Sequence, residues 1–124
     1  MPRNLMFALL LGASAAVQAQ PAVVTVRLSN FSFTPNSIQL GAGAPATLIL
    51  QNASHGGHNF SAPEFFAAAR IDPKSAALVR NGTVEVPGGG AVNVSLVPAA
   101  GSYRLKCTHT LHSTFGMKGT ILVR

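Results

Sequence analysis

The 124-residue sequence contains a single cysteine, Cys107, and few charged residues. With one cysteine the chain can form no internal disulfide, which excludes a disulfide-stapled fold. Charged residues make up 10% of the chain, and only three of them are acidic, so the formal net charge is +6. The basic residues are spread singly along the sequence. Nucleic acid, which binds clustered Lys and Arg, is therefore not an expected partner.

The N-terminal apolar run is too short to cross a membrane. It extends from Leu5 to Leu11, far short of the roughly 20 residues that a bilayer requires. Arg3 precedes it and small residues ending at Ala19 follow it, which is the layout of a secretory signal peptide. We expect residues 1–19 to be removed after Ala19. The remaining residues 20–124 would form one domain, periplasmic or secreted, without stable membrane insertion.

Apolar and polar residues alternate with period two in several short runs. Val24, Val26 and Leu28 form the first, and similar runs recur at 46–50, 92–96 and 121–123. This period is typical of a strand with one buried face. Turn residues rich in Gly, Pro and Asn separate the runs. The pattern predicts an all-β fold, a Greek-key β-sandwich.

One segment has the features of a short surface helix. Residues 63–70, PEFFAAAR, begin with proline and an acidic residue and end with arginine. Phe65 and Phe66 are expected to pack this helix onto the sandwich rather than to bind a ligand.

Residues that commonly bind metal ions gather in two short segments. After residue 19 the chain has one cysteine, one methionine and four histidines, and all of them lie within residues 52–60 and 107–117. In the strand-like GSYRLKC, Tyr103, Leu105 and Cys107 share one face, so the thiol should point into the core. A buried free cysteine can be mere packing. In an exported protein, however, an unpaired thiol needs a reason to persist, and metal binding supplies one.

The spacing Cys-x4-His-x4-Met places Cys107, His112 and Met117 on one loop, and His58 is available as a second imidazole. Two imidazoles, one thiolate and one thioether form the mixed soft set that suits copper in both oxidation states. Zinc is a weaker alternative, because methionine is an unusual zinc ligand.

The sequence resembles the cupredoxins, the type 1 blue-copper family that includes plastocyanin and azurin. The resemblance extends from Val23 to Arg124 and is carried by FSFTPNSIQLGAG, the His58-Asn59 pair, GSYRLKC and GMKGTILV. The four-and-four spacing of the ligand loop is similar to that of rusticyanin and auracyanin. The family implies one copper ion, cycling between Cu(I) and Cu(II). Its ligands would be one imidazole nitrogen each from His58 and His112, the Cys107 thiolate and a distant axial Met117, and Asn59 would tie the two ligand segments together.

His55 and His109 are surplus to that ligand set, and each is expected to be a surface residue. Of the two, His109 is the stronger alternative to His112 as a metal ligand, since it lies only two residues after Cys107. If Cys107 and His109 bound the same ion, the single residue between them would strain the trigonal plane of ligands. His112 is therefore favoured as the second imidazole ligand.

The candidate ligand set and the number of histidines bear on three possible functions. The four-ligand set favours a monomeric one-electron carrier. We expect its redox partner to be an acidic protein, because Arg104 and Lys106 precede the ligand loop and Lys118 follows it. A copper sequestration or delivery protein is the alternative. An enzyme is not expected, because four histidines are too few for additional copper centres and no acidic residue near Cys107 orients a catalytic base.

Overall fold

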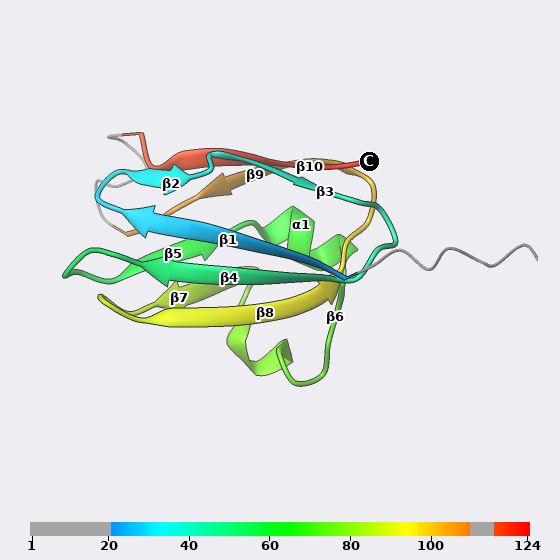
Figure 1. Cartoon of the computed structure of the whole chain (residues 1–124), viewed down its shortest axis with the longest axis horizontal. Coiled ribbons are helices and arrows are strands. Elements are labelled where there is room, and N and C mark those ends of the chain that lie inside the picture. Colours follow the sequence, from blue (N-terminus) through cyan, green and yellow to red (C-terminus); the bar gives the residue numbers. More distant parts are fainter. Residues whose placement is uncertain (1–20, 110–115) are drawn as a thin grey trace, which may run out of the picture.

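The structure is a computed structural model that describes residues 21–109 and 116–124. Within these residues, ten strands form two five-stranded sheets that face each other (Figure 1). One sheet has the order β2-β1-β4-β8-β6 and the other the order β3-β10-β9-β5-β7. The strands are β1 (Ala22–Ser29), β2 (Ser32–Thr34), β3 (Ser37–Leu40), β4 (Ala46–Asn52), β5 (His58–Ser61), β6 (Arg70–Ile71), β7 (Thr83–Val86), β8 (Ala91–Val97), β9 (Gly101–Lys106) and β10 (Lys118–Val123). The predicted all-β sandwich is confirmed.

The alternating runs form the long strands of the first sheet. Strand β1 pairs in parallel with β4, and β4 pairs antiparallel with β8. The inward positions are buried, as at Val26, Leu48 and Val94. Polar and charged positions between them, such as Arg27, lie on the outer face. The period-two pattern thus assigns these side chains to the correct faces.

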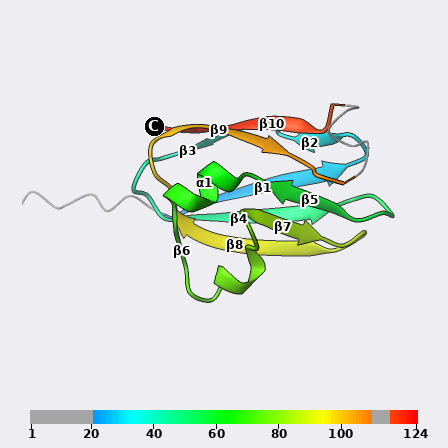
Figure 2. The same cartoon turned by 180° about the vertical axis from the view of Figure 1, so that it is seen from behind.

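The predicted helix is present but shorter than expected. Helix α1 spans Pro63–Ala68, with proline in its first turn and Phe65 and Phe66 buried. It lies beside β9 (Figure 2). The predicted extension to Arg70 is wrong, because Ala69 has extended backbone angles and Arg70 pairs with Val97 of β8. A single 3-10 turn at Ala76–Leu78 follows, which the sequence pattern did not indicate.

Aromatic rings fill the space between the sheets around β5. Phe60 of β5 makes edge-to-face contacts with Phe33 and Phe66, with ring centroids 6.0 Å apart in both cases. Phe65 packs in the same manner on Tyr103 of β9, at 5.5 Å. Such pairs stabilise a core by about 0.5–1.5 kcal/mol beyond the area they bury. These contacts fix the positions of β5 and β9, the strands next to the predicted ligands.

Three of the predicted ligand residues lie at strand ends. His58 begins β5, Cys107 directly follows β9 and Met117 directly precedes β10. Strands β5 and β9 are antiparallel, and so are β9 and β10, so these three termini lie at one end of the sandwich (Figure 1). No helix in the described ranges is long and apolar enough to cross a membrane.

Candidate metal centre

Cys107 is buried in the interior between the sheets, as its strand position predicts. Its side chain has no exposed surface, and Leu105 on the same face is 1% exposed. Arg104 and Lys106 on the opposite face are exposed. The alternation of β9 therefore directs the sulfur inward, where solvent cannot reach it.

The first predicted imidazole lies next to this sulfur. Nδ1 of His58 is 3.9 Å from Sγ of Cys107, and His58 is 1% exposed. Two ligands of one ion, with metal–sulfur and metal–nitrogen bonds of about 2.3 and about 2.1 Å at about 120°, lie about 3.8 Å apart. The two side chains are therefore spaced as two ligands of a single metal ion. An imidazole nitrogen and a cysteine sulfur are a donor pair that suits copper.

Asn59 joins the two segments that carry these residues. Its backbone N–H donates to Sγ of Cys107 at 3.4 Å. Its side-chain Oδ1 accepts the backbone N–H of Thr108 at 2.8 Å, and Nδ2 donates to the Thr108 hydroxyl at 2.7 Å. The link between the ligand segments that the family resemblance implied for Asn59 is present.

Met117 is fully buried, and its backbone carbonyl accepts the N–H of Cys107 at 3.1 Å. This bond holds the start of β10 against the end of β9. His112, the second predicted imidazole, lies outside the described residues. In the described ranges no three His, Cys, Asp or Glu side chains form a cluster that could hold a metal ion. His58 and Cys107 are two such side chains, and Met117 would add a thioether, a different type of ligand.

His109 makes a different contact from His58. Its Nε2 donates to Oε2 of Glu85 at 2.9 Å, and its side chain is 35% exposed. Burial raises the pKa of Glu85, but hydrogen bonds from Asn59 and His109 and the charge of His109 lower it, so the net pKa lies below the ordinary 4.5. Glu85 carries a negative charge at neutral pH as a result.

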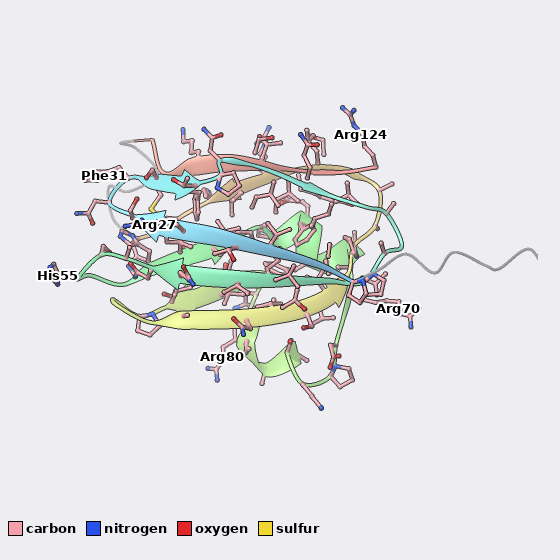
Figure 3. The ribbon with its side chains drawn as sticks, in the orientation of Figure 1. Arg27, Phe31, His55, Arg70, Arg80 and Arg124 are labelled. Atoms are coloured by element: carbon pink, nitrogen blue, oxygen red, sulfur yellow. The ribbon has the colours of Figure 1, made fainter. Side chains whose placement is uncertain are left out.

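His55 points away from the molecule at the tip of the β4–β5 loop (Figure 3). The buried Asn52 holds this loop, donating from Nδ2 to the carbonyls of Gly56 and Val86 at 2.9 and 3.0 Å. Its Oδ1 accepts from the hydroxyl of Ser54 at 2.7 Å. Sequence reasoning missed Asn52 and Glu85, since each acts through strands that only the fold brings together.

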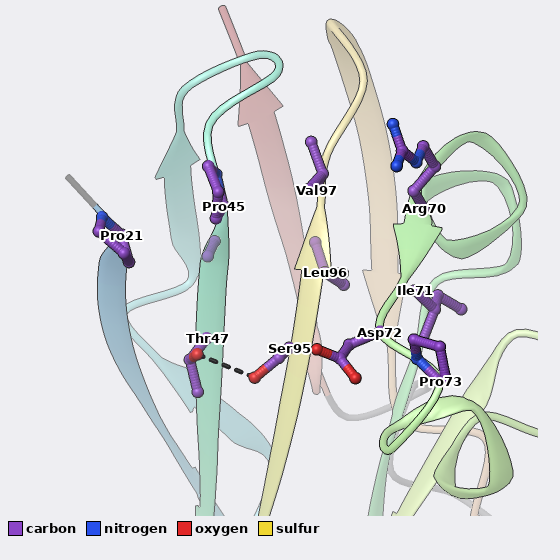
Figure 4. A pocket seen from close by; sticks show the side chains of 11 residues that line it. Pro21, Pro45, Thr47, Arg70, Ile71, Asp72, Pro73, Ser95, Leu96 and Val97 are labelled. Atoms are coloured by element: carbon purple, nitrogen blue, oxygen red, sulfur yellow. Dashed lines mark hydrogen bonds between the residues drawn. The ribbon is translucent and has the colours of Figure 1, made fainter. Parts of the chain in front are cut away.

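A hollow lies at the end of the sandwich opposite the candidate metal centre, between the start of β4 and the end of β8 (Figure 4). Its polar groups are the Arg70 guanidinium, the Asp72 carboxylate and a hydroxyl pair, Thr47 with Ser95, at 3.0 Å. It contains neither cysteine nor histidine. The metal-binding chemistry of the described chain is thus concentrated at the His58 end.

Fold and site together define a β-sandwich with a buried histidine and cysteine side by side at one end. A family model described as a cupredoxin-like domain matches residues 3–123. The chain therefore belongs to the cupredoxin-like family, as the sequence resemblance indicated. The comparison with curated proteins gives no match.

Solved structures with a similar fold include three auracyanins. Auracyanin B is 23% identical, with a TM-score of 0.60, covering 86% of this chain and 90% of its own. A dithionite-reduced auracyanin from the photosynthetic bacterium Roseiflexus castenholzii is 19% identical, with a TM-score of 0.62, covering 83% and 97%. Auracyanin A, described as a "blue" copper protein from Chloroflexus aurantiacus, is 21% identical, with a TM-score of 0.59, covering 84% and 99%. At these identities the likeness establishes the shared fold.

Proposed function

We propose that the protein is an exported mononuclear type 1 copper protein that carries single electrons, with His58, Cys107, His112 and Met117 as ligands. The observation that carries this proposal is the buried pair of His58 Nδ1 and Cys107 Sγ, 3.9 Å apart. A copper ion bound there would supply reversible one-electron redox chemistry. The protein's own contribution is to hold the donors in a fixed geometry and to exclude water.

The rigid surroundings of the site favour electron transfer over catalysis. Cys107 is tied to Asn59 and to Met117 through backbone N–H groups, and the strands beneath it are fixed by aromatic packing. A donor set that barely moves suits a centre that gains and loses an electron without rearranging. The four histidines of the chain leave too few imidazoles for a further copper centre. We therefore propose no enzymatic turnover.

The visible spectrum of the purified protein after addition of Cu(II) tests the site. An intense thiolate-to-copper band at one equivalent is the expected result, and its absence would contradict the copper assignment. Competition with a Cu(I) chelator then separates a carrier from a protein for copper sequestration or delivery. A carrier retains its copper through repeated redox cycles, whereas a delivery protein loses it to the chelator.

We propose export to the periplasm or the medium, based on the N-terminal pattern of Arg3, an apolar run and small residues up to Ala19. Mass spectrometry of the protein recovered from the periplasm and the medium tests this proposal. A mass that corresponds to residues 20–124 is expected. A full-length chain retained in the cytoplasm would contradict it.

We propose that the protein is a monomer and that its partner is an acidic redox protein. Lys106 and Lys118 are directly opposite each other in the β9–β10 register, both exposed, and Arg104 is on the same face. These three cations and one carboxylate, that of Glu64, line an open groove next to the metal end, so its side chains carry a net positive charge. Like charges directly opposite in a sheet are destabilising, so a binding role offers a reason for the arrangement.

An apolar contact would complete docking at the same end. Phe31, at the tip of the β1–β2 turn, is 45% exposed and lies near that end (Figure 3). Leu111 and Phe115 flank His112 in the sequence and are proposed to extend this apolar surface; they lie outside the described residues. Stopped-flow electron transfer to an acidic partner should slow as ionic strength rises, because the screening length shrinks to about 8 Å at 0.15 M salt. A rate that stays flat or rises with salt contradicts the charge-steering proposal.

A further inference from the structure

One carboxylate, that of Glu85, touches both segments that carry the candidate ligands. Glu85 is directly opposite Asn59 in the β5–β7 register. Its Oε1 accepts from Nδ2 of Asn59 at 2.9 Å, and its Oε2 accepts from Nε2 of His109 at 2.9 Å. The carboxylate therefore bridges the strand that begins with His58 and the segment that follows Cys107.

The bridge continues directly to the sulfur. Asn59, which Glu85 orients, donates its backbone N–H to Sγ of Cys107 and holds Thr108 with two further hydrogen bonds. Asn59 is 2% exposed, whereas the Glu85 side chain that covers its amide is 65% exposed, so without the carboxylate only mobile water could take its place. A buried amide that loses a fixed hydrogen-bond acceptor is held less firmly in its orientation. Loss of Glu85 should therefore loosen the hold on Thr108 and on the sulfur next to it.

The charge of Glu85 has a separate effect. A negative charge close to a redox centre stabilises the more positively charged oxidised state. The carboxylate is two hydrogen-bonded steps from Sγ of Cys107, through Asn59. The other acidic residue suited to comparison, Asp72, lines the hollow at the opposite end of the sandwich.

We propose that Glu85 is a positioning residue of the metal site: it locks the segment after Cys107 onto β5 and β7, and its charge lowers the reduction potential of the bound ion. The inference rests on the proposed copper site for its second half only. The first half concerns the protein without metal, and the two halves can be tested separately.

The metal-free test measures how fast iodoacetamide alkylates Cys107. In Glu85→Ala the rate should rise severalfold over wild type, because the bridge that holds Thr108 and His109 against β5 and β7 is gone. In Glu85→Gln, which keeps an oxygen acceptor for Asn59 and nearly the same volume, it should stay close to wild type. Equal rates in wild type and Glu85→Ala would overturn the positioning role, whether or not the protein binds copper.

The copper-loaded test compares two variants that remove one negative charge each. Voltammetry should give a higher reduction potential for Glu85→Gln and an almost unchanged one for the matched control Asp72→Asn. The thiolate band should persist in both. Equal shifts in the two variants, or none in Glu85→Gln, would overturn the charge role. A wild-type protein that takes up no copper would instead refute the proposed function and leave the alkylation result standing.

Discussion

Nδ1 of His58 lies 3.9 Å from Sγ of Cys107, although the two residues are 49 positions apart in the chain. Ser61, the last residue of β5, pairs antiparallel with Lys106, so the start of β5 extends past the end of β9 and lies beside Cys107. The distance is that of two ligands on one ion.

Replacing Cys107 with serine should abolish the thiolate-to-copper band, because a hydroxyl oxygen cannot provide the sulfur charge transfer. The sandwich should still fold, with a loss of about 1–3 kcal/mol for burying a hydroxyl. Visible spectroscopy checks the band, and circular dichroism with chemical denaturation checks the fold. A serine variant that remains coloured would show that the thiolate is not a ligand.

The two loop histidines should differ in their effect on the spectrum. His112→Ala is expected to destroy the native copper spectrum, since it removes one of two imidazole ligands. His109→Ala should alter it little, because Nε2 of His109 is hydrogen bonded to Glu85. Copper titrations of the two variants side by side decide the matter. The reverse ranking would transfer the ligand role to His109.

Met117→Leu should keep the copper and raise its reduction potential. Loss of a weak axial donor from an apolar pocket disfavours the more positively charged Cu(II) state. The exchange nearly conserves volume at a fully buried position, so the stability cost should be below about 1.5 kcal/mol. Voltammetry and thermal unfolding measure the two effects. An unchanged potential would make Met117 a packing residue only.

Two glycines with the same backbone conformation should respond differently to alanine. Gly82 and Gly43 have φ of 71° and 72°, so at either position a side chain costs about 1–2 kcal/mol of backbone strain. A Cβ at Gly82 would also overlap Pro63 at the start of α1, whereas at Gly43 it would meet open space. Gly82→Ala should therefore lose clearly more unfolding free energy than Gly43→Ala. Equal losses in denaturation would exclude the contact with Pro63.

The decrease of the unfolding free energy at acid pH should depend in part on Glu85. Its pKa is below 4.5 in the folded protein, so its contribution is fully present above pH 4.5 and is lost as the pH falls through the folded value. The unfolding free energy of the metal-free protein should exceed that of Glu85→Gln at neutral pH. Below pH 4.5 this difference should shrink, as chemical denaturation across pH can determine. A difference that is the same at pH 3 and pH 7 would refute the linkage.

The buried faces of the strands were predictable from the sequence because side-chain direction alternates residue by residue. Cys107 is buried with Leu105, while Lys106 between them is exposed, as the pattern of β9 predicts. Phe65 and Phe66 pack inward from the predicted helix for a similarly local reason. The end of that helix was not predictable, because Arg70 leaves it to pair with β8, which is distant in the chain.

The amino-acid sequence is enough to show which groups this protein has for metal binding: after residue 19 it has one thiol, one thioether and four imidazoles, all in two short segments. Tertiary structure alone decided which of them meet. The position of His58 beside Cys107, and the bridge that Glu85 forms between Asn59 and His109, depend on the pairing of β5 with β7 and β9. That pairing results from the packing of two whole sheets, a property that no short segment of the chain contains.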